Sequence, residues 1–354
     1  MYQIPFAILL LALSVNGWSA NHCVILQYHH FSEDTPAITS VTPRQFEQHL
    51  DYLADNDFKV MALRDVALAL QHQLELPDKC VSLTVDDAYI SVYENAFPRM
   101  RARGWPMTVF VASKPVDDGL KHFMSWQQMR EMSAHGFSFE NHGHGHIHMI
   151  RRADGESEMD WLQRVDVDIG TAQQRIEREI GDAPRLFAWP YGEFDARLVP
   201  LIEKRQLIGF GQQSGPAWPD ANLAYLPRFP MAAHYANLEG FITKVNTLPL
   251  PVARAEPAEP LTARAPVRPR LTLTLVSGRY SRDNLRCYIS GRDQVELRWL
   301  ESTADTVEIR PQFDLAAGRH RTNCTMPSRQ RGRFHWYSHN WFVRKANGDW
   351  YAEY

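Results

Sequence analysis

The 354-residue sequence has no long apolar run, no basic stripe and no CxxC pair, and each absence excludes a class of protein. The apolar run at residues 4–15 is too short to cross a bilayer comfortably, so no stable membrane span is expected once it is removed. A formal net charge of −3 without clustered Lys and Arg gives a nucleic-acid partner no electrostatic support. Without a CxxC pair, a structural zinc–thiolate site is not expected.

The N-terminal segment has the pattern of an export signal. The apolar run is followed by the small residues Gly17, Ser19 and Ala20 near a plausible cleavage point, which predicts a signal peptide over residues 1–20. The alternative is a buried N-terminal helix. Export predicts a mature protein that is periplasmic or secreted.

Export also gives the four cysteines a role, because an oxidising compartment favours two disulfide bonds. Cys287 and Cys324 lie in the same C-terminal region and form a natural pair. Cys23 and Cys80 each precede an apolar run that reads as a strand, so their thiols would lie close together if those strands were neighbours. The sequence alone allows three connectivities.

Apolar runs alternate with helix-like segments from residue 23 to about residue 248. VILQYHHF, VSLTVDD and MTVFVA read as strands, and a helical segment begins with Thr42 as its cap and Pro43 at its first position. This alternation predicts an α/β fold with a parallel sheet, most economically closed as a barrel. We expect this domain to cover residues 21–247.

The composition changes after the barrel. Residues 248–270 are rich in Pro, Ala and Arg, which predicts an extended linker. Residues 271–354 contain short strand-like runs separated by turn residues, which predicts a small all-β, sandwich-like module.

Carboxylates and imidazoles follow the predicted strands. Asp86 and Asp87 close VSLTVDD, and His142 closes FSFENH, at the strand ends where active-site groups of parallel α/β barrels gather. Two adjacent aspartates point in different directions, so one can bind a metal ion while its neighbour stays free as a base. The alternative is that the pair only caps the next helix.

The stretch NHGHGHIHM places four histidines at alternate positions, His142, His144, His146 and His148. A carboxylate with two imidazoles suits a catalytic divalent metal ion. A helical turn would pair His142 with His146, or His144 with His148, whereas an extended chain would pair His142 with His144. A solvated histidine loop without a site is a further alternative, and spacing does not decide among them.

Three motifs in fixed order resemble a known family. TVDDAY, NHGHGH and AWPYGEFD are similar to the core motifs of the polysaccharide deacetylases, the NodB-homology group or carbohydrate esterase family four. The resemblance runs from YHHF at 28–31 to FPM at 229–231, and YHHF and WPYG are similar to the exported poly-N-acetylglucosamine deacetylases. It implies a distorted (β/α)7-type parallel barrel.

The resemblance also implies roles for particular residues. Asp86 would be the general base, and Asp87, His142 and His146 would bind one divalent metal ion, most readily zinc, with cobalt, nickel or iron as alternatives. The backbone N–H of Tyr191 would help to hold the oxyanion. His144 and His148 would then face the substrate or be incidental.

Two departures from the family pattern affect the site. Ala88 stands where the family has Gly, so the backbone there must tolerate a Cβ atom. The arginine that usually precedes PYG is absent, and we expect Arg228 to orient Asp86 instead, in preference to Arg185.

The proton donor has no clean counterpart in the sequence. His234 is the histidine nearest to the family's late histidine motif and is our expected general acid. His29 and His30 follow the first strand and could serve as acid or as an extra ligand, or could have structural roles only.

Aromatic residues could bind sugar rings. We expect Trp189, Pro190 and Trp126, which belong to loops of the barrel, to contact substrate. The tryptophans of the C-terminal module could do the same, but a small sandwich also needs large side chains for its core, and we favour that role.

The sequence thus predicts an exported, metal-dependent polysaccharide deacetylase that releases acetate from N-acetyl groups of a hexosamine-containing polysaccharide or oligosaccharide. One alternative is an O-acetyl esterase with the same metal centre. A second is a non-catalytic carbohydrate-binding protein that kept the barrel. The oligomeric state is not predicted.

Overall fold

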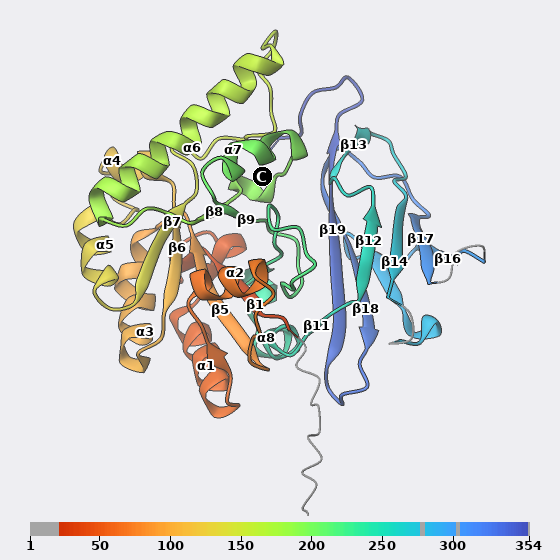
Figure 1. The fold of residues 1–354 in the computed structure, drawn as a ribbon, viewed down its shortest axis with the longest axis horizontal. Helices are drawn as coiled ribbons and strands as arrows, with labels where there is room; N and C mark the ends of the chain where they lie inside the picture. Colours follow the sequence, from red (N-terminus) through yellow and green to blue (C-terminus); the bar gives the residue numbers. More distant parts are fainter. Residues whose placement is uncertain (1–20, 277–279, 302–304, 353–354) are drawn as a thin grey trace, which may run out of the picture.

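The computed structural model describes residues 21–276, 280–301 and 305–352, and the predicted signal peptide lies outside them. An α/β barrel occupies the N-terminal part, and a β sandwich lies against one of its sides (Figure 1). Within the described ranges, no helix combines the length and the apolar character that crossing a membrane requires.

The barrel is a curved, wholly parallel sheet with the strand order β10-β1-β5-β6-β7-β8-β9, and with β4 paired to the start of β5. Its strands are β1 (Val24–Tyr28), β4 (Lys59–Val60), β5 (Cys80–Asp86), β6 (Met107–Val111), β7 (Phe137–Asn141), β8 (Leu186–Ala188), β9 (Ile208–Phe210) and β10 (Phe229–Pro230). A parallel bridge between Phe210 and Leu226 joins the two edges, so the sheet is a distorted barrel, as predicted.

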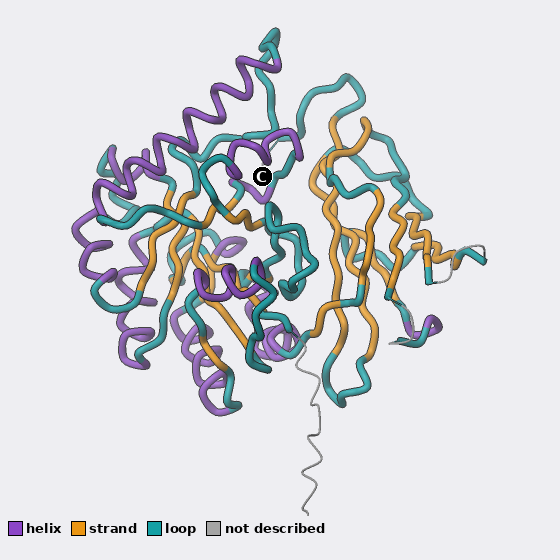
Figure 2. The backbone as a smooth tube through the Cα atoms, viewed as in Figure 1, coloured by secondary structure: helices purple, strands orange, loops and turns teal. Residues whose placement is uncertain are grey.

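Helices cover the outside of the barrel (Figure 2). They are α1 (Pro43–Asp55), α2 (Leu63–Gln71), α3 (Phe97–Arg103), α4 (Ser113–Asp117), α5 (Trp126–Ser133), α6 (Glu158–Ile180), α7 (Val199–Glu203) and α8 (Leu238–Val245). Short elements lie between them, namely β2 (His30–Phe31), β3 (Ser40–Val41), the π-helical turn η2 (Val92–Ala96), and the 3-10 turns η1 (Ala37–Thr39), η3 (Pro190–Gly192), η4 (Ala196–Leu198) and η5 (Ala233–Ala236).

Local sequence explains where α1 begins. The Thr42 side chain accepts a hydrogen bond from the Gln45 N–H, the Gln45 side chain accepts one from the Thr42 N–H, and Pro43 occupies the first turn. The buried face of α1, which includes Phe46 and Leu50, then packs on the sheet.

Alternate residues of the strands enter two different cores. Val24 and Leu26 of β1 pack with the surrounding helices, whereas Ile25 packs with Phe110 and Phe210, which project from other strands. One face of the sheet is therefore covered by helices, and the opposite face forms an inner core to which Leu63, Val66 and Leu70 of α2 also contribute.

The C-terminal module is a sandwich of two sheets. One has the order β11-β19-β18-β15 with β13 beside β19, and the other has the order β12-β14-β17-β16. Leu273, Ile309 and Trp341 of the two sheets share one apolar core. The elements are β11 (Leu248–Pro249), β12 (Val252–Glu256), β13 (Leu261–Arg264), β14 (Leu271–Leu275), η6 (Arg282–Asn284), β15 (Arg286–Ile289), β16 (Val295–Trp299), β17 (Thr306–Pro311), β18 (Gly318–Pro327) and β19 (Phe334–Arg344).

The segment 248–270 is extended, as predicted, but it does not act as a separate linker. Its strands β11 and β13 pair with β19, and β12 pairs with β14. Pro251, Pro257, Pro260 and Pro266 fall between these short strands, where the missing N–H of proline interrupts no ladder. We therefore propose that the module begins near residue 248.

Both disulfides connect the predicted cysteines. Cys23 and Cys80 join the starts of the neighbouring strands β1 and β5, and Cys287 and Cys324 stand opposite each other on β15 and β18. Each domain is thus cross-linked within itself.

Strand β19 carries the contact between the two domains. Its Trp336 packs edge-on against Phe229 of β10, and its Phe342 belongs to the core that also contains Phe187 and Trp189. The sandwich therefore packs directly on the barrel.

Candidate active site

Three side chains that could bind a metal ion meet at the carboxyl ends of the barrel strands. Asp87 follows β5 directly, and its Oδ1 atom lies 3.4 Å from Nε2 of His142 and 3.2 Å from Nε2 of His146. All three ligand atoms lie within 4.8 Å of one another, and no other such group occurs in the ranges that the structure describes.

Two atoms of this cluster have the environment of metal ligands. Nδ1 of His142 is 2.7 Å from the carbonyl oxygen of Ala188, which can only accept, so Nδ1 carries the proton and Nε2 offers its lone pair. Oδ1 of Asp87 is buried and has no hydrogen-bond partner. A buried polar atom without a partner is costly, and a cation between Asp87 and the two imidazoles would compensate it. The residues present therefore fit a divalent ion.

The electrostatics of the cluster favour positive charge at its centre. Burial raises the pKa of Asp87, but the His146 and His142 imidazoles outweigh burial and hold that pKa well below its usual range. Burial lowers the pKa of His146 to about 4, which keeps its imidazole neutral at neutral pH. Burial also acts to lower the pKa of His142, but Asp86 and Asp87 together raise it.

The other two histidines of the stretch point elsewhere. Nδ1 of His144 is hydrogen-bonded to Oγ of Ser113 at 2.8 Å. Nδ1 of His148 donates to Oε2 of Glu193 at 2.8 Å, and its ring stacks on Tyr191 with centroids 3.8 Å apart. Of the pairs that the spacing allowed, the structure brings together the one formed by His142 and His146.

Asp86 ends β5 and is completely buried beside Arg228, which is also completely buried. Nη1 and Nη2 of Arg228 donate to Oδ1 and Oδ2 of Asp86 at 2.7 and 2.8 Å, and Nε2 of Gln27 donates to Oδ2 at 2.6 Å. Burial raises the pKa of Asp86, but the charges of Arg228 and His142 outweigh it and leave the pKa lowered. Arg185, the less favoured arginine, instead donates its backbone N–H to Glu140.

The loops that carry these side chains have strained backbones. Asp87, Ala88, His146 and Tyr191 have φ values of 73°, 62°, 49° and 60°, in the left-handed region that costs a non-glycine residue about 1–2 kcal/mol. After His142, Asp168 of α6 accepts hydrogen bonds from the N–H groups of His144 and Gly145. Packing thus holds the site in a conformation that the isolated loops would avoid.

Sequence reasoning missed two residues of this site. Gln27 stands just before YHHF, and the alternation of β1 that turns Ile25 inward also turns Gln27 toward Asp86. Tyr89 belongs to TVDDAY, and burial together with the nearby charge of Asp87 raises the pKa of its phenol. A polar residue at an inward-facing strand position was the available signal for Gln27.

The structure does not support several of the expected substrate contacts. Trp189 is completely buried, its Nε1 donates to Ala224, and Pro190 is buried beside it, so neither offers a face to a sugar. Nε1 of Trp126 donates to Asp117, and the ring packs against the barrel core. Trp189 and Pro190 were misassigned because a residue in a loop motif can equally anchor that loop, whereas the role of the half-buried Trp126 stays a prediction.

The expected proton donors differ in position. His234 is exposed in η5, and its ring contacts Tyr235. His29 directly follows Tyr28, which pairs with Val85 in the parallel ladder of β1 and β5, so it lies at the strand end that carries Asp86. His30 is buried and stacks on Tyr89 at 3.7 Å. The strand register therefore places His29, and not His234, beside the carboxylate pair.

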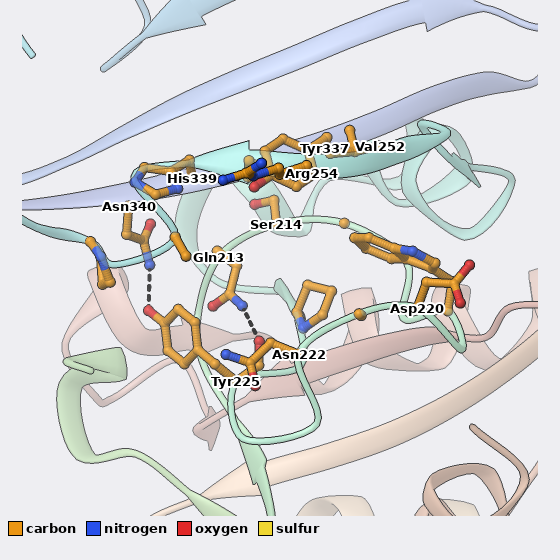
Figure 3. Close-up of a pocket in the computed structure, with 18 of the residues that line it drawn as sticks. Gln213, Ser214, Asp220, Asn222, Tyr225, Val252, Arg254, Tyr337, His339 and Asn340 are labelled. Carbon is orange, nitrogen blue, oxygen red and sulfur yellow. Dashed lines mark hydrogen bonds between the residues drawn. The ribbon is translucent and has the colours of Figure 1, made fainter. Parts of the chain in front are cut away.

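A hollow at the junction of the two domains is separate from this cluster (Figure 3). The loop after β9 contributes Gln213 and Trp218, and the module contributes Arg254, Tyr337 and His339. None of the three metal-ligating residues lines it. The acetyl group that reacts is therefore not placed in this hollow.

Comparison with known proteins agrees with the motifs. Residues 73–207 match the family model for polysaccharide deacetylase. The protein YxkH of Bacillus subtilis (strain 168) is 26% identical over 216 residues, which cover 58% of this chain and 69% of YxkH. The poly-beta-1,6-N-acetyl-D-glucosamine N-deacetylase of Staphylococcus aureus (strain MSSA476) is 26% identical over 195 residues, which cover 53% of this chain and 67% of that protein.

The barrel also has a solved structural relative. The Streptococcus pyogenes deacetylase PplD, solved in complex with acetate, superposes with a TM-score of 0.57 at 22% sequence identity. The match covers 63% of this chain and 98% of PplD. The predicted barrel fold is thereby confirmed.

Proposed function

The barrel of this chain belongs to the polysaccharide deacetylase family, and from that premise we propose that the protein is an exported, metal-dependent enzyme that removes N-acetyl groups from a hexosamine-containing glycan. The observation that carries the proposal is the convergence of Asp87, His142 and His146 beside the buried pair of Asp86 and Arg228. A binding protein without catalysis would need no buried carboxylate held by an arginine next to a metal-ligating cluster.

Asp87, His142 and His146 would hold one divalent ion, for which zinc suits the ligand set best and cobalt, nickel and iron are alternatives. When bound, such an ion would polarise the acetyl carbonyl group and make a neighbouring water more acidic. The hydrogen bond from His142 to Ala188 fixes the imidazole tautomer that this role requires.

Asp86 would act as the general base. Arg228 and Gln27 occupy one acceptor position on Oδ1 and two on Oδ2, which leaves a position on Oδ1 for a proton. Asp86 would take a proton from the attacking water molecule while the oxygen of that water bonds to the acetyl carbon. The Tyr191 backbone N–H would then stabilise the negative oxygen of the tetrahedral intermediate.

The leaving nitrogen must receive a proton as the C–N bond breaks, which gives acetate and a free amino sugar. We propose His29 as the donor in place of His234, because it follows β1 at the strand end that carries Asp86, whereas His234 is exposed in η5. His29→Ala should lower kcat by about 10²-fold, whereas His234→Ala should leave it within a factor of about two. The reverse result would restore the original assignment to His234.

The preference for N-acetyl groups is supported by the poly-beta-1,6-N-acetyl-D-glucosamine N-deacetylase among the relatives. An O-acetyl esterase would use the same centre with a different leaving group. Export is supported by the two disulfides, which persist in oxidising compartments.

The decisive experiment measures acetate release by the full chain from β-1,6-linked N-acetylglucosamine oligomers and from acetylated xylan. Chelation should abolish release, and zinc should restore it. Release from xylan alone would favour the O-acetyl esterase. If neither substrate released acetate after metal loading, and Asp86→Asn left sugar binding intact, the non-catalytic alternative would stand.

A further inference from the structure

The loop that carries the Tyr191 N–H is held largely from outside the barrel. Nη1 of Arg319, on β18, donates to the Tyr191 carbonyl oxygen at 3.0 Å. The hydroxyl of Tyr351, which follows β19, donates to Oε1 of Glu193 at 2.8 Å. Because Tyr191 has a φ of 60°, its conformation depends on such external contacts.

Gly192, which lies between Tyr191 and Glu193, is held by the module through Tyr225 of the barrel. Nδ2 of Asn340, on β19, donates to the Tyr225 hydroxyl at 2.8 Å, and that hydroxyl donates to the Gly192 carbonyl oxygen at 2.7 Å. Figure 3 shows Asn340 pointing across the domain junction to Tyr225. Three consecutive residues of the loop, 191 to 193, thus each receive a hydrogen bond that depends on a different side chain of the module.

The opposite wall of the loop is held by the module as well. A Cβ atom on Gly192 would lie 2.6 Å from Cβ of Gln212, so the two chains are in close contact. Nη2 and Nη1 of Arg321, on β18, donate to the Gln212 carbonyl oxygen at 2.6 Å and to Oγ of Ser214 at 2.8 Å. The module therefore fixes both the loop and the segment on which it rests.

A chain of contacts leads from the module to a metal-ligating residue. Glu193, which is completely buried, accepts from Tyr351 of the module and from His148 and Arg151 of the barrel. His148 stacks on Tyr191 with ring planes 12° apart, and the Tyr191 ring lies 4.5 Å from the ring of His146. Figure 1 shows the chain returning from β19 to the barrel, where Tyr351 makes this contact.

We propose that the β module is part of the catalytic unit, in which Arg319, Asn340 and Tyr351 are positioning residues that hold the 191–193 loop with its N–H directed at the reacting acetyl group. The proposal rests on the proposed deacetylase function, and it assigns the module a role other than carbohydrate binding. It also assigns a role to His148, whose ring packs against the ring of Tyr191.

The test uses the full-length protein loaded with zinc and N-acetylglucosamine oligomers as substrate. Arg319→Ala, Asn340→Leu and Tyr351→Phe should each lower kcat by about 3- to 10-fold, and the triple variant by about 100-fold. KM and the zinc dissociation constant should stay within about twofold of wild type, because neither the substrate contacts nor the ligands are removed.

Two matched variants separate positioning from docking of the domains. Arg333 also joins the module to the barrel, through Asp78 and the Asn246 carbonyl oxygen, but it does not contact the loop. Tyr288 lies on β15 and is 38% exposed. Arg333→Ala and Tyr288→Phe should retain the wild-type kcat. If Arg333→Ala lowered kcat as much as Arg319→Ala, or if the triple variant kept the wild-type kcat, the proposal would be overturned.

Hydrogen exchange provides a readout that does not require activity. Backbone amides of residues 191–194 should exchange faster in the triple variant than in wild type, and Arg333→Ala should leave them unchanged. Unchanged exchange in the triple variant would also overturn the proposal. Wild-type protein that released no acetate would refute the proposed function, whereas the exchange measurement would still decide whether the module holds the loop.

Discussion

The barrel and the β module are stabilised in similar ways but differ in where they keep charge and strain. Each has a continuous apolar core and one disulfide. The buried Asp, Glu, Arg and Lys side chains of the described barrel are Asp86, Asp87, Glu140, Glu193, Asp195, Arg228 and Lys244, whereas Glu308 is the one in the described module. Left-handed backbone at non-glycine residues is confined to Ser290 and Asp305 in the described module.

This difference shows which domain carries the chemistry and how the other contributes. Buried charge and strained backbone both cost stability, so they persist where surrounding contacts hold them in place. At the carboxyl ends of the barrel strands, the buried charges of Asp86 and Asp87 coincide with left-handed backbone at Asp87, Ala88, His146 and Tyr191. The module has no comparable cluster among its described residues, and the polar side chains that it turns toward the barrel reach the same end of the barrel.

The largest effect should follow from removing a metal ligand of the barrel. His142→Ala should abolish zinc binding measured by calorimetry and lower acetate release by at least about 10³-fold, because Asp87 loses a partner at the ion. His339→Ala removes a buried imidazole from the module and should leave the zinc dissociation constant unchanged. His144→Ala is the control within the barrel, and loss of zinc binding in that variant would refute the ligand assignment.

A buried ion pair and an exposed one should differ almost as strongly. Arg228→Met leaves Asp86 charged and unpaired in the interior and should lower the free energy of unfolding by about 3–5 kcal/mol. Arg268→Met removes the Arg268–Asp314 pair from the surface of the module, where the two side chains are 57% and 54% exposed, and should not change stability measurably. Urea denaturation measures both, and equal effects would contradict the contrast between the domains.

The two disulfides should contribute nearly equally to stability. The Cys23–Cys80 and Cys287–Cys324 bonds close segments with sequence separations of 57 and 37, and the entropy of loop closure depends only on the logarithm of that length. Replacing either pair by serine should cost about 2–4 kcal/mol, and the two losses should differ by about 0.4 kcal/mol. A much larger loss for one domain would show that its native contacts are strained without the bond.

The barrel could be predicted because its signals are local. Periodic apolar runs, together with the caps Thr42 and Ser125, marked the helices, and each strand reads as a continuous apolar segment. The strands of 248–270 could not be found in this way. Their pairing with β19 depends on residues far along the chain, and the proline content resembles that of a linker.

The residues of the site likewise divide into those that a local sequence pattern predicts and those that it does not. Asp86, Asp87, His142 and His146 belong to short motifs, so their neighbourhood could be inferred, and the contact of Arg228 with Asp86 also agrees with expectation. The partners of the loop could not be inferred. Arg319 and Tyr191 are 128 residues apart, and their contact arises from the packing of two folded domains, which no local pattern encodes.

The smallest effect should come from restoring the family's glycine at a strained position of the barrel. Ala88 has a φ of 62°, and Ala88→Gly would relieve about 1–2 kcal/mol of backbone strain. The variant would also lose a completely buried methyl group, worth about 0.8 kcal/mol, and would make the unfolded chain more flexible, at about 0.4–1 kcal/mol. These contributions nearly cancel, so the free energy of unfolding should change by less than about 1 kcal/mol and kcat by less than about twofold. A stability loss above about 2 kcal/mol would mean that the Ala88 methyl group supports the Asp87 loop more than its conformation strains it, and the strain argument for this edge of the barrel would fail there.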